Sequence, residues 1–255
     1  MNGFKPRSFL DRLTPTEFHK LGSHSPAFFG AAQTGFSPLD ISGLKVWLDA
    51  SDASTITKDG GDAVSVWNDK TTEANDFAQA TGSDQPLWVD SVLNSLPVIR
   101  FDGTSDFMQR TTWTGGAMTQ QVMMFWVAKY DQGSISGYLF DGGGASNRVF
   151  SYGGGVDDIH YFAGIGRDTG AAKGTTHRLY TFLFNGASSN FRINKSSVDT
   201  GDTGTDSCNG MTLARRHTAT AWGEVDIAEF LVYDATISDT DRDAVEDYLT
   251  DKWGL

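Results

Sequence analysis

The sequence is short of cysteine and of long apolar runs. One cysteine, Cys208, occurs in 255 residues, so no internal disulfide can form, and we expect that residue to be a small buried side chain. No segment approaches the ~18 consecutive apolar residues of a membrane-spanning helix, and residues 1–13 lack the apolar run of a secretory signal. These absences predict a soluble protein that is made in the cytoplasm and has no membrane partner.

Basic residues are also scarce. The chain carries 32 acidic and 20 basic residues, a formal net charge of −12. A basic face is what phosphate binding requires, so this balance disfavours nucleic acid as a partner. Residues 1–25 depart from the rest, with four basic residues against two acidic ones. A basic segment on an acidic body predicts docking to an acidic surface, such as a neighbouring copy of the same chain.

Residues 1–40 form a segment of distinct composition, which holds four of the six prolines and six of the seventeen phenylalanines. Proline interrupts helices and sheet ladders, so we expect an extended arm with little regular structure. Spaced aromatic residues can fill pockets on a partner, or on the arm's own domain. The residues that we expect to bind a partner are Phe4, Phe9, Leu10, Phe18, Phe28 and Phe29.

The body, residues 41–255, has the pattern of many short strands separated by glycine, asparagine and aspartate. Such spacing predicts an all-β fold, a two-sheet antiparallel sandwich or jelly roll. The expected strands are residues 44–48, 64–67, 97–101, 121–130, 137–141, 147–152, 159–163, 177–184, 189–194, 209–214 and 224–233.

Three of these strands, within 122–128, 179–184 and 227–233, are apolar on both faces, although a sandwich strand normally has one solvated face. Something must cover them: the arm, a second subunit, or the helix that we expect over residues 238–253. Ser238 and Asp241 have the spacing of a helix cap. Val245, Leu249 and Trp253 share one helical face.

Several motifs together resemble laminin-G-like, concanavalin A-like domains of bacterial and phage proteins. They are residues 41–52, 64–70, 97–103 with 106–108, 226–234, and the closing residues 252–255. The resemblance spans about residues 41–255 and implies a concanavalin A-like jelly roll. The fold itself hosts lectins, glycosidases and virion proteins, so it does not determine a function.

Relatives with this opening and close are frequent among tailed-phage structural proteins. The resemblance therefore implies a phage virion protein, and we expect a capsid decoration or cement protein assembled in the host cytoplasm. Its arm would hold capsid proteins or copies of itself, and the protein would form a homo-oligomer. Whether it belongs to the head or the tail, and with what symmetry, stays open.

Glu224, Asp226 and Glu229 form the pattern E-x-D-x-x-E, which also occurs in β-glucanases of this fold. There, the resemblance implies, the first glutamate is the nucleophile and the last the acid/base. Strand periodicity places Glu224 and Asp226 on one face and Glu229 on the other, unless a bulge intervenes. The motif also lies close to the end of the chain, so we expect no enzyme, with β-glucan hydrolysis as the less favoured alternative.

Two further kinds of site are considered. Trp88, Trp113 and Trp222 lie near expected loops and could stack on a sugar ring, so a carbohydrate-binding module of a tail or fibre is the first alternative function. No histidine or cysteine spacing supports zinc, and we expect no cofactor. Calcium is an open alternative. Its candidate ligands are Asp49, Asp52, Asp69, Asp102, Asp106, Asp157 and Asp158.

Overall fold

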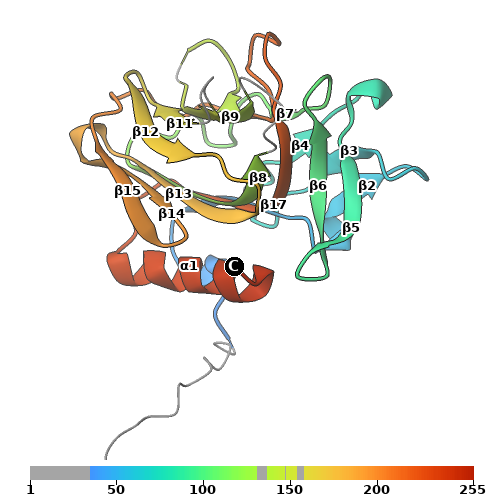
Figure 1. Ribbon diagram of the computed structural model, residues 1–255, viewed down its shortest axis with the longest axis horizontal. Helices are drawn as coiled ribbons and strands as arrows, with labels where there is room; N and C mark the ends of the chain where they lie inside the picture. The colour runs from blue at the N-terminus through green and yellow to red at the C-terminus, as the bar shows by residue number, and fades with distance from the viewer. Residues whose placement is uncertain (1–34, 131–136, 147, 154–157) are drawn as a thin grey trace, which may run out of the picture. The chain divides into compact units, whose positions relative to one another are not determined.

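The computed structural model describes residues 35–130, 137–146, 148–153 and 158–255. Within them, two antiparallel sheets lie face to face (Figure 1). The first, sheet A, has the order β15-β14-β13-β8-β17-β6-β5, and β1 also pairs with β17. Its strands are β1 (Leu44–Asp49), β5 (Leu87–Leu93), β6 (Leu96–Asp102), β8 (Val122–Tyr130), β13 (Arg178–Phe184), β14 (Ser189–Ile193), β15 (Ser196–Gly201) and β17 (Glu224–Tyr233).

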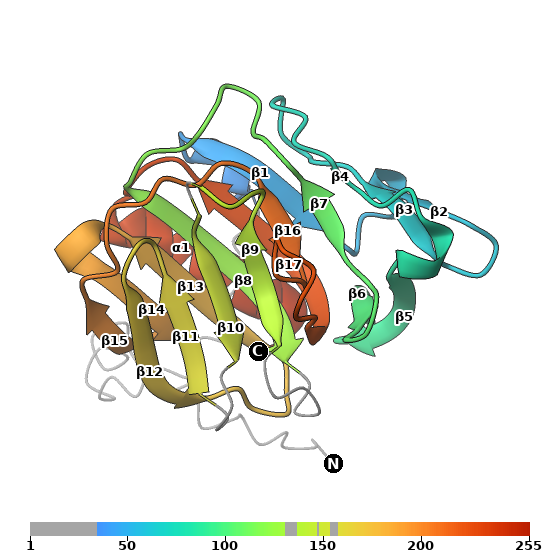
Figure 2. The same cartoon turned by 90° about the horizontal axis from the view of Figure 1, so that it is seen from above.

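Sheet B is the second layer and has the order β12-β11-β10-β9-β16-β7-β4-β3-β2. Figure 2 shows β9 to β12 side by side on the far side of the sandwich from the helix. Its strands are β2 (Ile56–Lys58), β3 (Val64–Trp67), β4 (Phe77–Ala78), β7 (Met108–Arg110), β9 (Tyr138–Gly142), β10 (Phe150–Gly153), β11 (Asp158–Phe162), β12 (Gly166–Ala172) and β16 (Met211–Leu213). The sequence-based prediction of an all-β sandwich is confirmed.

The main core lies between the sheets, where alternate residues of each strand face inward. Its centre is aromatic: Trp126 on β8 stacks on Phe140 of β9 at 4.8 Å and on Phe230 of β17 at 3.6 Å, measured between ring centroids. All three side chains are fully buried. Burial of such rings is the main favourable contribution to the stability of the sandwich, at about 25 cal/mol per Å² of apolar surface.

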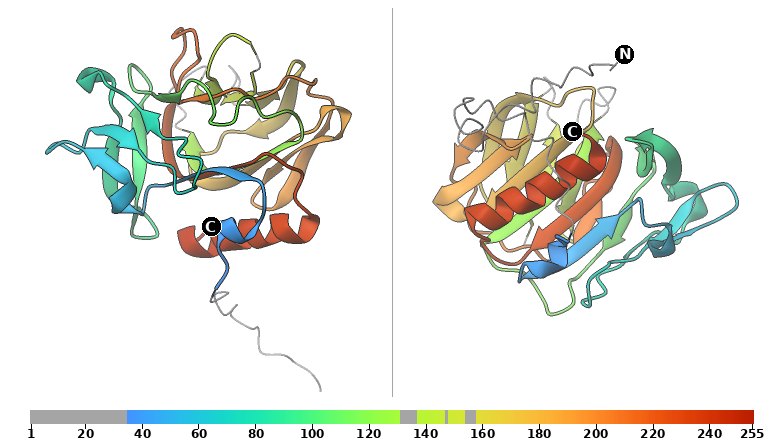
Figure 3. Two further views of the ribbon diagram at one scale, coloured as in Figure 1. Left: turned by 180° about the vertical axis from the view of Figure 1, so that it is seen from behind. Right: turned by 90° about the horizontal axis from the view of Figure 1, so that it is seen from below.

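A second apolar layer lies on the outer face of sheet A. The helix α1 (Asp239–Trp253) crosses that face and packs on β8, β13 and β17 (Figure 3). Ser238 caps the helix by accepting from the Asp241 N–H at 3.1 Å, and Gly254 ends it in the left-handed conformation. The sequence prediction of this helix, and of a cover for the three doubly apolar strands, is confirmed.

The chain enters the sandwich near the same helix. Phe36 and Ile41 pack against the layer under α1, and Tyr233 donates to the carbonyl of Pro38 at 3.0 Å. Short 3-10 turns follow at Pro38–Asp40, Ala53–Thr55, Gly82–Asp84 and Gly186–Ser188. The predicted partner-binding residues of the arm lie outside the described residues: Phe4, Phe9, Leu10, Phe18, Phe28 and Phe29.

Six strands were not predicted: β2, β4, β5, β7, β12 and β15. All six are three residues or shorter or lie at a sheet edge, where packing places little demand on sequence. β12 contains two glycines and two charged residues among its seven. In the part of the chain that is described, no helix has the length and apolar character needed to cross a membrane.

Candidate functional site

The E-x-D-x-x-E pattern lies on β17, and its geometry is set by a bulge. Ile227 pairs with Ala128 of β8 and Glu229 pairs with Val127, which leaves Ala228 as an extra residue. The bulge places Glu224, Asp226 and Glu229 on the same outer face of sheet A. Strand periodicity places Glu229 on the opposite face unless a bulge intervenes, and the structure contains that bulge.

Glu229 is nevertheless sealed under α1. Its side chain is fully buried and accepts four hydrogen bonds. The donors are Trp47 Nε1 at 2.7 Å, Tyr248 Oη at 2.9 Å, Lys252 Nζ at 2.7 Å and Trp253 Nε1 at 2.6 Å. Burial, and then the charge of Asp49, raises the pKa of Glu229. A carboxylate with all its acceptor sites occupied and no exposed surface cannot reach a glycosidic bond, so the Glu224–Glu229 pair is not an acid/base pair.

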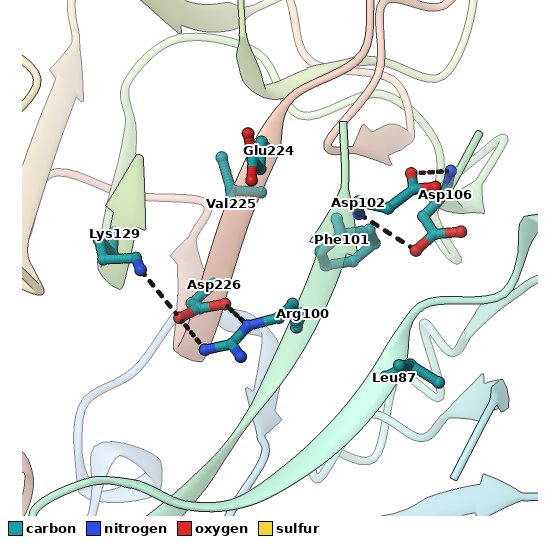
Figure 4. A pocket seen from close by; sticks show the side chains of 9 residues that line it. All are labelled: Leu87, Arg100, Phe101, Asp102, Asp106, Lys129, Glu224, Val225 and Asp226. Atoms are coloured by element: carbon teal, nitrogen blue, oxygen red, sulfur yellow. Dashed lines mark hydrogen bonds and ion pairs between the residues drawn. The ribbon is translucent and has the colours of Figure 1, made fainter. Parts of the chain in front are cut away.

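The uncovered end of the same face holds a cavity of about 310 Å³, which we call the carboxylate pocket (Figure 4). Acidic and basic side chains from β6, β8 and β17 converge there, together with Asp106 from the loop after β6. The lining residues are Leu87, Arg100, Phe101, Asp102, Asp106, Lys129, Glu224, Val225 and Asp226.

Asp226 is the most heavily paired group of the carboxylate pocket. Arg100 binds it through two hydrogen bonds of 2.7 and 2.9 Å, and Lys129 and His177 approach to 3.6 and 3.4 Å. Burial alone would raise the pKa of Asp226, but the bonds from Arg100 and His177 and the charge of Arg100 hold it well below its usual range. Asp226 is therefore a fixed anion that orients the basic side chains around it.

Asp102 and Asp106 face each other across a turn. Asp106 N–H donates to Asp102 at 3.0 Å, and Asp102 N–H donates to Asp106 at 3.1 Å. Burial and the neighbouring charge of Asp102 raise the pKa of Asp106 to about 6. Burial acts in the same direction on Asp102, but hydrogen bonds from the Ser105, Thr104 and Asp106 N–H groups and from the Thr104 hydroxyl hold its pKa low. Asp106 therefore keeps its proton in mildly acidic solution, below about pH 6, while Asp102 stays ionised. Under those conditions the pocket offers ligand hydroxyls both a donor and acceptors.

A second surface lies on the outer face of sheet B, and we call it the aromatic face. It consists of Tyr138 on β9, Phe150 and Tyr152 on β10, and His160 and Phe162 on β11. Tyr152 stacks on Tyr138 at 5.2 Å and on His160 at 4.8 Å, and Phe150 stacks on Phe162 at 4.5 Å. Four of the five side chains are half-buried. These rings pair across strands and form two parallel rows.

One edge of the aromatic face is held by a buried carboxylate. Asp141 is fully buried, binds the guanidinium of Arg148 at 2.9 and 2.8 Å, and lies 2.9 Å from both His217 Nδ1 and the His217 backbone N. Arg148 in turn lies 4.7 Å above the ring of Phe150. Asp141 thus fixes a guanidinium and an imidazole beside the aromatic rows, as a preorganised binding site requires.

A further basic side chain, Arg216, comes from the hairpin between β16 and β17, which rises above sheet B in Figure 1. The hairpin returns close to β9: a Cβ at Gly223 would lie 2.1 Å from the carbonyl oxygen of Tyr138, so only glycine fits there. Burial, and then Asp141, raises the pKa of Tyr138, while Arg216 and Arg148 act in the opposite direction. Asp141, Arg148 and Arg216 therefore lie close enough to Tyr138 to act on its hydroxyl electrostatically.

The three tryptophans predicted to bind a glycan do not converge. Trp113 is only 4% exposed and packs on Phe77, so it offers no ring surface to a sugar. Trp88 is half-buried on β5 and donates to the carbonyl of Ala50 at 3.0 Å. Trp222 is half-buried and lies on the hairpin that carries Arg216, where its backbone pairs with that of Arg215 in an isolated β-bridge. Glycan binding by Trp88 and Trp222 stays a prediction.

The aromatic face was missed as a site, although part of its signal is visible in the sequence. Phe150 and Tyr152, and likewise His160 and Phe162, alternate as residues on one face of a strand do. The intervening Tyr161 is equally aromatic but faces the core, so the pattern does not distinguish the outer face from the inner one.

The calcium candidates are dispersed among other partners. Asp49 binds Lys70 and Lys252, Asp69 accepts from backbone N–H groups, and Asp102 pairs with Asp106. Asp52 also binds Lys70, and Asp157 lies outside the described residues. Among the residues that are described, no group of three His, Cys, Asp or Glu side chains has an arrangement that could hold a metal ion.

Comparison with known proteins shows the fold. No family model and no curated protein sequence matches the chain. Solved structures do match. A Trypanosoma rangeli sialidase bound to sialic acid is 12% identical, with a TM-score of 0.52, over 83% of this chain and 33% of the sialidase. An arabinofuranosidase bound to arabinofuranosyl-α-1,2-xylobiose is 11% identical, with a TM-score of 0.60, over 84% of this chain and 60% of the enzyme.

The receptor-binding domain of a botulinum neurotoxin C/D mosaic is 7% identical, with a TM-score of 0.58, over 80% of this chain and 51% of that domain. The chain thus spans a third to three fifths of the proteins that it matches. The expectation that the chain is no enzyme is contradicted by these neighbours, because two of the three are glycoside-cleaving enzymes. What the comparisons establish is a β-sandwich of the glycosidase and lectin-like kind.

Proposed function

We propose that this protein binds carbohydrate on the outer face of sheet B. The observation that carries the proposal is the aromatic face itself: five stacked side chains that stay half-buried or nearly buried on a sheet face, flanked by an arginine and a histidine that Asp141 orients. A patch of aromatic surface with a few fixed polar groups is the usual composition of a small-ligand site. The sugar-bound structures that share the fold support the same class of ligand.

The orientation of the two outer faces also supports this location. On sheet A, α1 covers the apolar side chains, whereas in the described part of the chain no helix lies over β9 to β12 (Figures 1 and 2). The polar groups at the rim are mostly donors or can act as donors: the Tyr138 and Tyr152 hydroxyls, the His160 imidazole and the guanidinium groups. Sugars present hydroxyl oxygens to such donors and apolar ring edges to the aromatic carbons.

The proposal is tested by glycan-array screening of the whole chain, followed by titration calorimetry of any ligand with two alanine variants. Tyr152→Ala removes the central ring of one row and should abolish detectable binding. Trp88→Ala, which removes a half-buried ring on sheet A, is the matched control and should bind as the parent does. Loss of binding in Trp88→Ala with retention in Tyr152→Ala would move the site to sheet A, and an empty array would reject carbohydrate binding.

The capsid-decoration hypothesis rests on the family resemblance and on the arm, residues 1–40, of which residues 1–34 lie outside the described residues. None of the three neighbours described above is a virion protein. The hypothesis stays a prediction, as does the virion location. Density-purified particles from the source culture, tested by mass spectrometry for this chain, would decide it.

A further inference from the structure

We infer that the glycan taken by the aromatic face is acidic, with carboxylate groups of the uronic-acid kind, and that one carboxylate binds at Arg216. This inference rests on the proposed function and adds the ligand class and its orientation. Three observations carry it: the upright packing of the rings, the unused donors of Arg216, and the uneven distribution of charge along the face.

The rings of the aromatic face stand upright on the sheet. Tyr138, Tyr152 and His160 are cross-strand neighbours, and their planes lie within 20° and 11° of each other at centroid distances of 5.2 and 4.8 Å. Stacking along the direction from strand to strand, where neighbours are ~4.8 Å apart, turns the ring edges outward. Aromatic edges carry partial positive charge and ring faces partial negative charge. The surface therefore favours oxygen-rich, anionic groups over stacking of a neutral sugar face.

Arg216 has donors to spare. A guanidinium has five N–H donors in a fork that matches a carboxylate. Among the described residues, the Arg216 side chain makes a single hydrogen bond, to Thr220 Oγ1 at 3.5 Å, and its covered Nε has no acceptor. A ligand carboxylate in the fork would supply the missing acceptors through charge-assisted bonds, which are roughly twice as strong as neutral ones.

The other charges define the polarity of the site. Arg148 and His217 are already bound to Asp141. They therefore form a fixed edge of the site and are less able than Arg216 to bind a ligand carboxylate. At the opposite edge, Asp168 of β12 pairs with His160 across the strands and is exposed, which disfavours an anion there. The net charge of −12 acts at longer range and is screened beyond ~8 Å at physiological salt. Local attraction at the Arg216 end therefore decides where the carboxylate binds.

The test uses a galacturonic acid pentasaccharide and the same oligosaccharide with its carboxyl groups reduced to alcohols, each titrated calorimetrically against the full chain. We expect the acidic form to bind at least about tenfold more tightly, a difference of about 1.4 kcal/mol, because a charge-assisted hydrogen bond is roughly twice as strong as a neutral one. Arg216→Gln should remove this preference, and Arg216→Lys, which keeps the charge without the fork, should keep part of it.

Arg242→Gln is the control, because it removes one positive charge from the exposed side of α1. It should leave the preference unchanged. Equal affinity for the two oligosaccharides, or an equal loss for both in Arg216→Gln, would overturn the inference while leaving carbohydrate binding intact. No binding of either form, together with an empty glycan array, would overturn the inference and the proposed function together.

Discussion

The two outer faces of the sandwich both carry apolar and aromatic side chains, but they differ in whether another element covers them. On sheet A the central strands are apolar on both sides, and α1 buries their outer side chains, among them Phe125, Leu231 and Tyr233. On sheet B the outer side chains of β9, β10 and β11 are aromatic as well, yet four of the five rings remain half-buried. Aromatic content alone therefore does not separate a structural surface from a binding surface. The cover does.

The polar groups differ in the same way. Under α1, Glu229 and Glu246 are fully buried, and each is bound by donors from the opposite element. Their role is to fasten the helix to the sheet. On sheet B, the buried Asp141 binds Arg148 and His217, which lie at the rim of a surface that no helix of the described residues covers. A buried carboxylate holds a structural element in the first case and orients binding groups in the second.

The largest effect on stability is expected at the contact that holds α1 on sheet A. Glu229→Ala leaves the indole N–H groups of Trp47 and Trp253 without their acceptor and leaves Lys252 with Asp49 alone. It should lower the free energy of unfolding by about 3–5 kcal/mol. Glu73→Ala is the control, since Glu73 forms a part-exposed pair with Lys45 and should cost less than about 1 kcal/mol. Urea denaturation followed by tryptophan fluorescence measures both. A loss below 1 kcal/mol in Glu229→Ala would contradict the role of Glu229 as a clamp.

A matched pair of truncations separates stability from binding. Leu249→Ala, on the buried face of α1, should cost about 2–4 kcal/mol and leave glycan affinity unchanged. Phe162→Ala, at the end of an aromatic row, should cost only about 1 kcal/mol, because the ring is half-buried, yet weaken glycan binding. Thermal unfolding and calorimetric titration of both variants provide the comparison. If Phe162→Ala unfolds the protein as readily as Leu249→Ala, the aromatic face is a structural layer.

The sequence predicts the covered face better than the open one. A buried face appears in the sequence as a regular spacing of apolar residues within one segment. The helix is predicted in this way from Val245, Leu249 and Trp253, and the covered strands from their apolar residues on both faces. The cross-strand rows of rings depend on register between β9, β10 and β11, which no single strand encodes. The bulge at Ala228, which turns Glu229 toward α1, is likewise a product of tertiary packing. Arg216 and His217 are brought beside β9 by a hairpin far along the chain.

The smallest effect is expected in the carboxylate pocket, on the part of the sheet A face that α1 leaves open. Because the folded pKa of Asp106 is raised to about 6, above the value of an unfolded aspartate, the folded protein holds this proton more tightly. The stabilisation is complete below pH 4 and is lost as pH rises through 6. Asp106→Asn cannot ionise, so it should remove this fall.

The measurement is the free energy of unfolding in urea at pH 4, 5, 6 and 7 for the parent and for Asp106→Asn. The variant should become relatively more stable than the parent as pH rises from 4 to 6, and the difference should then level off. Asp239→Asn, an exposed position at the start of α1, is the control and should show no such trend. A difference that is constant with pH would show that folding does not raise the pKa of Asp106. Asp106 would then be ionised in mildly acidic solution and could not act as a proton donor in the pocket.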